Sequence, residues 1–176
     1  EAADRGTFFL DEIGDISVHI QAKLLAAIED KELRRIGDTD TRKIDTRYIC
    51  ATNKKLPQLL AGGRFRDDLY YRISILTIEL APLRQRKEDI PLLAKHILKK
   101  KSEENGIAFS INKPALIKLE KYHFPGNIRE LENILISACE LSHGGAITEK
   151  DVVLKNSAPR SNGSIVPCSQ RDRVIY

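Results

Sequence analysis

The sequence predicts an α/β fold in which a parallel sheet layer is followed by an all-helical subdomain. Short apolar runs alternate with helical patterns as far as Pro82, as they do where strands and helices alternate along a chain. From Glu88 onward, apolar residues recur only at helical spacing. The chain has 176 residues, 41% of them hydrophobic and 31% charged. It can therefore build a packed core in one domain or in two small ones.

The α/β part covers residues 1–82. We expect buried strands at three short apolar runs, Thr7–Leu10, Tyr48–Ala51 and Ile73–Leu80. The intervening elements are a helix over Ser17–Asp30, a hairpin with a polar turn over 32–44, and short helices over Pro57–Ala61 and Phe65–Arg72. Strands that alternate with helices in this way favour a parallel sheet.

The helical part covers residues 83–155. Its first predicted helix follows Glu88 and has apolar residues at positions i, i+3, i+4, i+7 and i+8, which form a core-facing stripe. Asn112 is a good N-cap for the next helix, because its side chain can accept a hydrogen bond from a first-turn amide. Pro114 then stands in the first turn, where a missing N–H costs little.

A third helix of this part begins near Asn127, and Glu130 three residues later makes a start that resembles a capping box. A last short helix is predicted over Thr148–Leu154. Residues 156–176 are polar and without periodicity, so we expect a tail or linker there.

Composition narrows the possible partners and the compartment. The net charge of +4 is too small to argue for DNA binding, and the basic run over 84–101 is either a solvated helix face or a phosphate or nucleic-acid surface. No apolar run approaches the ~18–20 residues that span a bilayer. The three cysteines lack metal-site or disulfide spacing, which favours a reducing cytoplasm. Since the chain contains no Met, we expect it to be a piece of a longer protein.

An acidic pair, Asp11-Glu12, follows the first predicted strand. In open parallel sheets ligands bind at the carboxyl ends of strands, so both acids can reach a bound group. Nucleotide hydrolysis uses such a pair, one acid for Mg²⁺ and one for the attacking water. The alternative is a strand that ends in a solvated acidic turn. Asn53 follows the second strand, where its amide can orient a water or phosphate oxygen, or simply cap the helix near Pro57.

Three arginines are candidate phosphate ligands, because the guanidinium group has forked donors and is always charged. Arg66 and Arg72 lie six residues apart, about 120° around a regular helix, so both can face one phosphate only if Arg72 lies at or beyond the helix end. Arg129 lies in the first turn of its helix, where a cation opposes the helix dipole and hints at an external anion. The alternative is an ordinary surface ion pair, between Arg72 and Asp67 or Asp68, or between Arg129 and Glu132 or Glu130.

Five segments together resemble the sigma-54-dependent transcriptional activators of the AAA+ class, also called bacterial enhancer-binding proteins. They are similar, in order, to that family's Walker B segment, sensor I, arginine-finger helix, linker to the lid, and sensor II: Gly6–Asp15, Ala51–Asn53, Gly63–Arg72, Leu83–Pro91 and Phe124–Leu131. The resemblance runs from about residue 1 to about residue 154. Two departures are Phe124, where the family usually has Trp, and Arg5, where it often has Gly.

This resemblance implies a partial AAA+ sheet layer, of the P-loop type, followed by a helical lid. It also implies ATP and Mg²⁺ as cofactors and a role for each candidate. Asp11 would hold Mg²⁺, through water, and Glu12 would activate the water. Asn53 would act as the sensor. Arg66 and Arg72 would act on nucleotide held by a neighbouring subunit, and Arg129 on nucleotide in its own subunit. Arg35 matches a family position near the subunit interface.

The resemblance further implies an intact protein that assembles as a ring, remodels sigma-54 RNA polymerase holoenzyme and binds DNA through a C-terminal domain not seen here. No Gly-Lys pair occurs in the sequence, so the Walker A motif G-x-x-x-x-G-K-[ST] is missing and we expect this chain alone to be inactive as an ATPase. Two alternatives stay open: a catalytically inactive truncated fragment that only interacts with AAA+ partners, and another type of AAA+ motor. No membrane association is expected.

Overall fold

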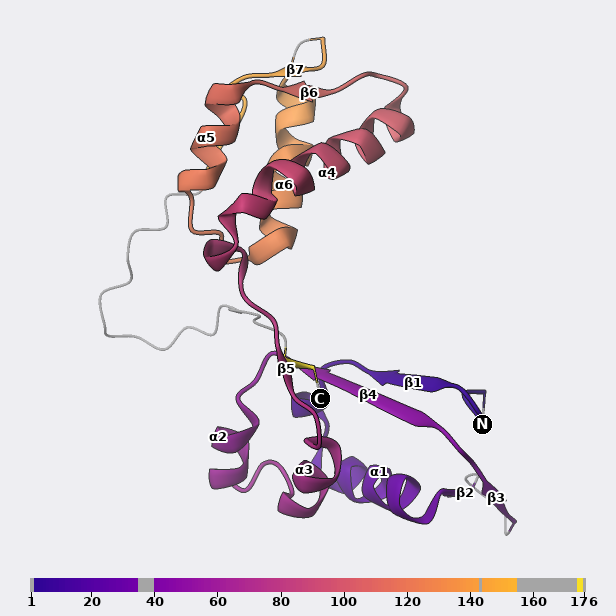
Figure 1. Cartoon of the computed structure of the whole chain (residues 1–176). Helices are drawn as coiled ribbons and strands as arrows, with labels where there is room; N and C mark the ends of the chain where they lie inside the picture. Colours follow the sequence, from indigo (N-terminus) through magenta and orange to yellow (C-terminus); the bar gives the residue numbers. More distant parts are fainter. Residues whose placement is uncertain (1, 35–39, 143, 155–173, 176) are drawn as a thin grey trace. The chain divides into compact units, whose positions relative to one another are not determined.

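A computed structural model of the chain describes residues 2–34, 40–142, 144–154 and 174–175 (Figure 1). The chain divides into two compact units, residues 1–80 with 171–176, and residues 81–170. We refer to the first as the sheet unit and to the second as the helical unit. The tail predicted over 156–176 lies outside the described residues, except for Val174–Ile175, which form a short strand.

The sheet unit is built on two adjacent parallel strands. Its elements are β1 (Thr7–Leu10), η1 (Ile13–Asp15), α1 (Val18–Asp30), β2 (Glu32–Arg34), β3 (Thr41–Lys43), β4 (Arg47–Thr52), α2 (Leu56–Ala61), α3 (Asp67–Ile73), β5 (Ile78–Glu79) and β8 (Val174–Ile175). The main sheet has the order β1-β4-β8-β5. β1 and β4 are parallel, as predicted, whereas β8 runs antiparallel to both of its neighbours.

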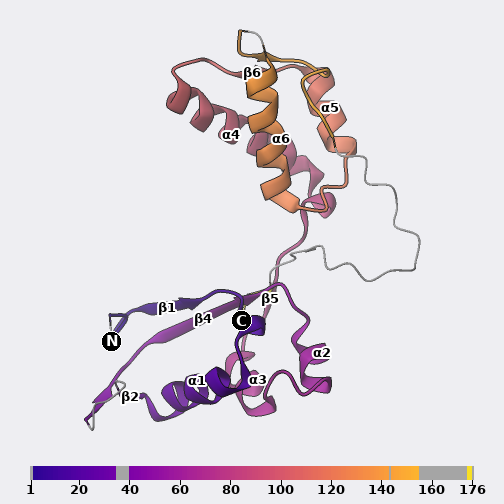
Figure 2. The same cartoon turned by 180° about the vertical axis from the view of Figure 1, so that it is seen from behind.

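All three α-helices of this unit lie on one face of the β1–β4 pair (Figures 1 and 2). The core between helices and strands contains Ile13, Cys50, Leu56, Leu59, Phe65, Leu69 and Ile73. Helix α1 begins after Ser17, whose hydroxyl accepts a hydrogen bond from the Ile20 amide. β2 and β3 form the predicted antiparallel hairpin, and the turn that joins them lies outside the described residues.

Two predictions for the sheet unit were wrong. β1 is not buried, because it lies at the edge of the sheet and helices cover only one face: Phe8 is 45% and Phe9 51% exposed. The strand predicted over Ile73–Leu80 is reduced to the two residues of β5. The start of that apolar run belongs to α3, since Ile73 is the last residue of that helix and packs into the core.

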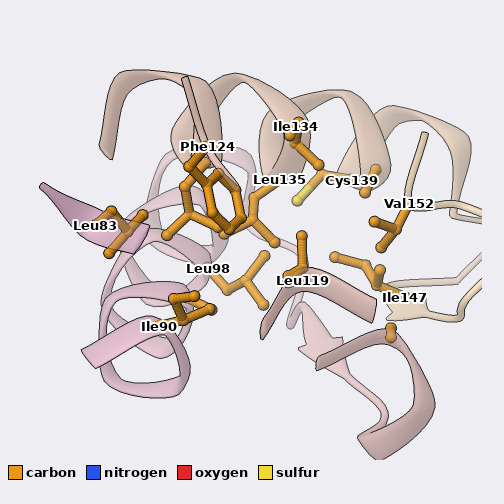
Figure 3. Close-up of a cluster of buried hydrophobic side chains, with 14 residues drawn as sticks. Leu83, Ile90, Leu98, Leu119, Phe124, Ile134, Leu135, Cys139, Ile147 and Val152 are labelled. Atoms are coloured by element: carbon orange, nitrogen blue, oxygen red, sulfur yellow. The ribbon is translucent and has the colours of Figure 1, made fainter. Parts of the chain in front are cut away.

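The helical unit encloses a continuous apolar core (Figure 3). Its elements are η2 (Leu83–Gln85), η3 (Lys87–Asp89), α4 (Ile90–Asn105), β6 (Ser110–Ile111), α5 (Lys113–Lys121), α6 (Asn127–Leu141) and β7 (Ala146–Ile147). Helix α5 is capped as predicted, because the Asn112 side chain accepts a hydrogen bond of 2.9 Å from the Ala115 amide. This unit is not purely helical, since β6 and β7 pair in parallel.

The segment Thr148–Leu154 is not the predicted helix. Asp151 accepts hydrogen bonds of 2.7 Å from both the amide and the hydroxyl of Thr148, which closes a single turn. Residues 152–154 belong to neither a helix nor a strand, and Val152 (1% exposed) packs into the core. The segment thus follows β7 over the core, and burial of Val152 prevails over helix propensity in so short a stretch.

The start of α6 also differs from the predicted capping box. Gly126 is the N-cap, and its amide donates to Glu130 Oε2 at 2.7 Å. Asn127 is the first residue of the helix, and its Oδ1 accepts from the Leu83 amide at 2.9 Å. The Glu130 carboxylate thus meets the amide of Gly126 instead of that of Asn127, and the Asn127 side chain ties the helix to η2.

Candidate functional site

The candidate site lies where β1 and β4 end. Since these strands are parallel and Leu10 pairs with Cys50, the residues that follow both strands meet at the same edge of the sheet. Asn53 Nδ2 donates a long hydrogen bond of 3.4 Å to Glu12 Oε1, across 41 residues of sequence. The fold thus brings together the acid and the amide that the sequence singled out separately.

Glu12 has an unusual backbone and a carboxylate oxygen without a partner. Its φ of 55° is left-handed, a conformation that costs energy for a residue other than glycine. Its Oε2 is buried and, within the described part of the chain, has no hydrogen-bond partner. Buried polar atoms are nearly always paired, so an unpaired carboxylate oxygen on a strained backbone is typical of a group that meets a ligand.

Asp11 is exposed at the end of β1. Its Oδ1 accepts a hydrogen bond of 3.0 Å from the Glu12 amide, which helps to hold the turn that carries the acidic pair. Carboxylate oxygens are ligands that Mg²⁺ prefers, and Mg²⁺ commonly takes one or two of them together with water and phosphate oxygens. The exposed acid and the unpaired Glu12 oxygen beside it therefore fit a magnesium–nucleotide complex.

The turns that follow β1 and β4 are tightly packed on each other. A Cβ atom on Gly14 would lie 2.7 Å from Thr52 Oγ1, so only glycine permits this approach. Lys54 Nζ pairs with Asp15 across the same gap, and the Thr52 hydroxyl accepts from the Lys54 amide at 3.1 Å. The ion pair is partly exposed and adds little energy by itself, but it joins the two turns that carry Glu12 and Asn53.

Arg66 and Arg72 stand at the two ends of α3. Arg66 is the N-cap, and Arg72 lies in the last turn and is still helical. The two arginines were expected to face one phosphate only if Arg72 lay at or beyond the helix end, and this condition is not met. Because Arg66 lies before the helix, its direction is not set by the helical repeat. Arg72 is exposed and forms no ion pair with any described residue, so the alternative of a surface pair with Asp67 or Asp68 is not seen.

Arg66 instead pairs with Asp68. Its Nε and one terminal nitrogen donate to the two carboxylate oxygens at 3.0 and 2.6 Å, which is a bidentate arrangement. The hydrogen bond from Arg66 lowers the pKa of Asp68 and raises the pKa of the guanidinium group. Both groups are exposed, so the pair orients the arginine at the surface and remains open to exchange for another anion.

Arg129 belongs to the helical unit, in the first turn of α6. Its side chain is exposed, and pairing with Glu130 is not seen, because the Glu130 carboxylate accepts from Gly126 and from the Tyr122 hydroxyl, the latter at 2.9 Å. The exposed arginine and the positive end of the helix dipole both attract negative charge, so this place favours the binding of an external anion. Arg35 lies outside the described residues.

Two side chains that matter for this geometry were missed by sequence reasoning. Lys54 carries no motif, and its pairing with Asp15 depends on the register of β1 and β4. Gln21 has the periodicity of an ordinary helix position, yet it is fully buried and hydrogen-bonded. Cys50 is buried in β4, as expected for a core cysteine, and burial raises the pKa of its thiol to about 11.

Comparison with known proteins defines the class of this chain. Residues 1–79 match the model of the Sigma-54 interaction domain, and residues 84–164 match that of the AAA+ ATPase lid domain. The chain thus contains a part that is similar to the Sigma-54 interaction domain and a part that is similar to an AAA+ lid domain. Within that class, it belongs to the family of the sigma-54-dependent transcriptional activators.

Relatives of the chain are regulatory proteins of bacteria. It is 48% identical over 151 residues to a Nif-specific regulatory protein of Bradyrhizobium diazoefficiens, and these residues make up 86% of this chain and 26% of that protein. It is 46% identical over 157 residues to the transcriptional regulatory protein ZraR of Salmonella typhimurium (89% and 36%). It is 41% identical over 175 residues to the response regulator protein PilR of Pseudomonas aeruginosa (99% and 39%). The chain therefore spans between about a quarter and two fifths of these relatives.

Solved structures of NtrX from Brucella abortus have the same fold. The complex with ATP has a TM-score of 0.79 at 31% identity and covers 86% of this chain and 36% of NtrX. Another NtrX structure has a TM-score of 0.82 at 30% identity and covers 93% of this chain and 38% of NtrX.

Among the described residues, no helix is both long enough and apolar enough to cross a membrane.

Proposed function

We propose that this chain is part of a ring-forming, cytoplasmic transcriptional activator that hydrolyses ATP between subunits and thereby remodels sigma-54 RNA polymerase for promoter opening. The contact between Glu12 and Asn53 at the shared edge of β1 and β4 carries the proposal. Nif-specific regulators and ZraR as relatives, and an NtrX structure with ATP, support it. DNA binding would reside in a domain outside this chain.

The two acids have distinct roles in this proposal. Asp11 holds the magnesium ion, through water, and Mg²⁺ neutralises charge on the phosphates when bound. Glu12 orients and deprotonates the attacking water with the oxygen that lacks a partner, Oε2. Asn53 fixes the other oxygen of that carboxylate, so the direction of Oε2 is set by the end of β4.

The arginines supply positive charge at the phosphates. Arg66 and Arg72 act on nucleotide held by a neighbouring subunit, and their positions at the two ends of α3 suit contacts with different oxygens. Arg129 acts on nucleotide in its own subunit. Asp68 holds the Arg66 guanidinium group at the surface before it meets a phosphate.

Because no Gly-Lys pair of a Walker A motif occurs in the 176 residues, we also propose that the chain alone binds Mg-ATP weakly and does not turn it over. Calorimetry with the purified chain tests this part, and binding in the micromolar range would contradict it. The coding DNA directly upstream of the Glu1 codon separates a working activator from an inactive fragment. An in-frame G-x-x-x-x-G-K-[ST] supports the first, and a stop codon the second.

The catalytic assignment is tested in the intact protein with Glu12→Gln and Arg66→Ala. We expect kcat for ATP hydrolysis to fall about 100-fold or more in each, since general-base and arginine-finger contributions are of this order or larger. Nucleotide binding should persist. Glu29→Gln, at an exposed position of α1, and Arg47→Ala, exposed at the start of β4 and thus at the end of that strand away from the site, are matched controls that should leave kcat unchanged. Wild-type turnover by Glu12→Gln would contradict the assignment.

A further inference from the structure

Gln21 is a fully buried amide in a helix whose other polar side chains face outward. It lies in the first turns of α1 and is 0% exposed. A glutamine is seldom fully buried, and burial of its amide is costly unless donors and acceptor are paired. The question is therefore what the buried amide is paired with.

Its partners are all backbone atoms. Nε2 donates to the carbonyl oxygen of Ile16 and to that of Arg64, both at 3.0 Å. Oε1 accepts from the amide of Arg66 at 2.8 Å. Both donors of the side chain are used, and its oxygen takes one of the two bonds it can accept.

These bonds join the two segments that carry the proposed chemistry. Ile16 follows the turn that contains the acidic pair, and Arg64 and Arg66 flank Phe65, which is 3% exposed and packs into the core of the sheet unit. The short segment 64–66 is thus held both by the burial of Phe65 and by the hydrogen bonds of Gln21. Arg66 is also the N-cap of α3, so its backbone position fixes where the guanidinium group leaves the surface.

We propose that Gln21 is a positioning residue for Arg66: its amide fixes the finger segment 64–66 against the segment that follows the acidic pair. This inference rests on the proposed function, in which Arg66 acts on the nucleotide of a neighbouring subunit. Loss of the amide frees the Arg66 backbone and leaves the Glu12–Asn53 contact in place, because that contact lies at the strand ends.

The test uses the intact protein with Gln21→Met, which keeps the length and volume of the side chain and removes all three bonds. The matched control is Gln58→Met, the same change at an exposed position of α2. We expect kcat to fall about 10- to 100-fold in Gln21→Met, as misplacement of a contributing group by about 1 Å can cost 100-fold, with KM for ATP within about twofold of wild type. An unchanged kcat would overturn the inference.

Mixed rings separate a finger defect from a defect of the subunit's own site. Glu12→Gln subunits supply normal fingers, and Arg66→Ala subunits supply normal acidic pairs, so mixing them should restore turnover if fingers act between subunits. Gln21→Met should restore turnover with Glu12→Gln and not with Arg66→Ala. No restoration with Glu12→Gln overturns the inference. No restoration in the mixture of Glu12→Gln with Arg66→Ala instead counts against the proposed function itself.

Amide hydrogen exchange gives a readout that does not depend on activity. In the wild-type protein the Arg66 amide should be protected, because it donates to a buried oxygen, and Gln21→Met should remove that protection while the amides in the middle of α1 stay protected. A wild-type Arg66 amide that exchanges at the rate of an open chain overturns the inference, whether or not the variant folds.

Discussion

The two units of the chain use their large apolar side chains differently. In the helical unit, Leu119, Phe124 and Leu135 are each 0% exposed within a core formed by residues of η2, the helices and the β7 segment (Figure 3). In the sheet unit, Phe9 is 51%, Ile75 84% and Leu76 70% exposed. Among the described residues, the helical unit has fewer large apolar side chains at the surface, with Leu92 (70%) and Val153 (60%) the most exposed. The two units contain a similar share of hydrophobic residues, so the difference lies in how their helices and strands are arranged.

The arrangement explains the difference physically. Helices can surround a core from several directions, whereas a sheet with helices on a single face leaves its other face open. Parallel strands are normally covered on both faces, and contiguous apolar surface marks a region that contacts something else. We therefore expect the helical unit to be stable by itself and the sheet unit to need further contacts.

The largest expected effect comes from separating the units. A polypeptide of residues 81–154 should unfold in one cooperative transition in urea, because its core is complete within those residues. A polypeptide of residues 1–80 should lack such a transition and self-associate, as its apolar face and the free edge of β1 are exposed. Circular dichroism and analytical ultracentrifugation measure both, with the full chain as control. If the polypeptide of residues 1–80 is monomeric and unfolds in a sharp transition, the proposed difference between the two units is wrong.

Removing one phenyl ring from each unit gives a smaller effect. In the full chain, Phe124→Ala should lower the free energy of unfolding of the helical unit by about 3–5 kcal/mol, as buried Phe→Ala changes do. Phe9→Ala is the same change at a half-exposed position and should stay within about 0.5 kcal/mol. Urea unfolding followed by circular dichroism measures both. Equal losses would mean that Phe9 is as well packed as Phe124.

The elements that the sequence predicted well have strong local signals. Helix α5 follows from the Asn112 cap and Pro114, and β1 and β4 follow from short apolar runs ahead of polar residues. The family resemblance then placed Glu12 and Asn53 in one site, and the parallel register brings their side chains into contact. Motif order along the chain was sufficient here because neighbouring parallel strands end at the same edge.

What could not be predicted depends on packing between segments far apart in the sequence. The burial expected for β1 presumes a covered second face, which local apolarity does not reveal. A short helix was predicted over Thr148–Leu154, but Thr148 and Asp151 close a single turn there and Val152 is buried in the core. Gln21 occupies an ordinary helix position in the sequence, and only the fold shows that its amide meets a segment 43 residues away.

The smallest effect is chemical and compares one buried thiol from each unit. Cys50 lies in β4 and Cys139 in α6, and burial raises the pKa of both thiols, that of Cys50 to about 11 from an ordinary 9.0. The folded state holds the Cys50 proton more tightly than the unfolded state. The associated stability is therefore fully present below pH 9 and is lost as the pH rises from 9 to about 11.

The rate of alkylation with iodoacetamide measures the ionisation of these thiols, in a Cys168→Ser variant that leaves only Cys50 and Cys139. Because only the thiolate reacts, the rate at Cys50 in the native chain should keep rising about tenfold per pH unit above pH 9, where the rate in urea levels off. Cys50 should also react faster than Cys139 at every pH, since the open sheet unit exposes its core more readily than the closed helical unit. Peptide mass spectrometry assigns each rate, and a slower Cys50 would reverse the order of the two units.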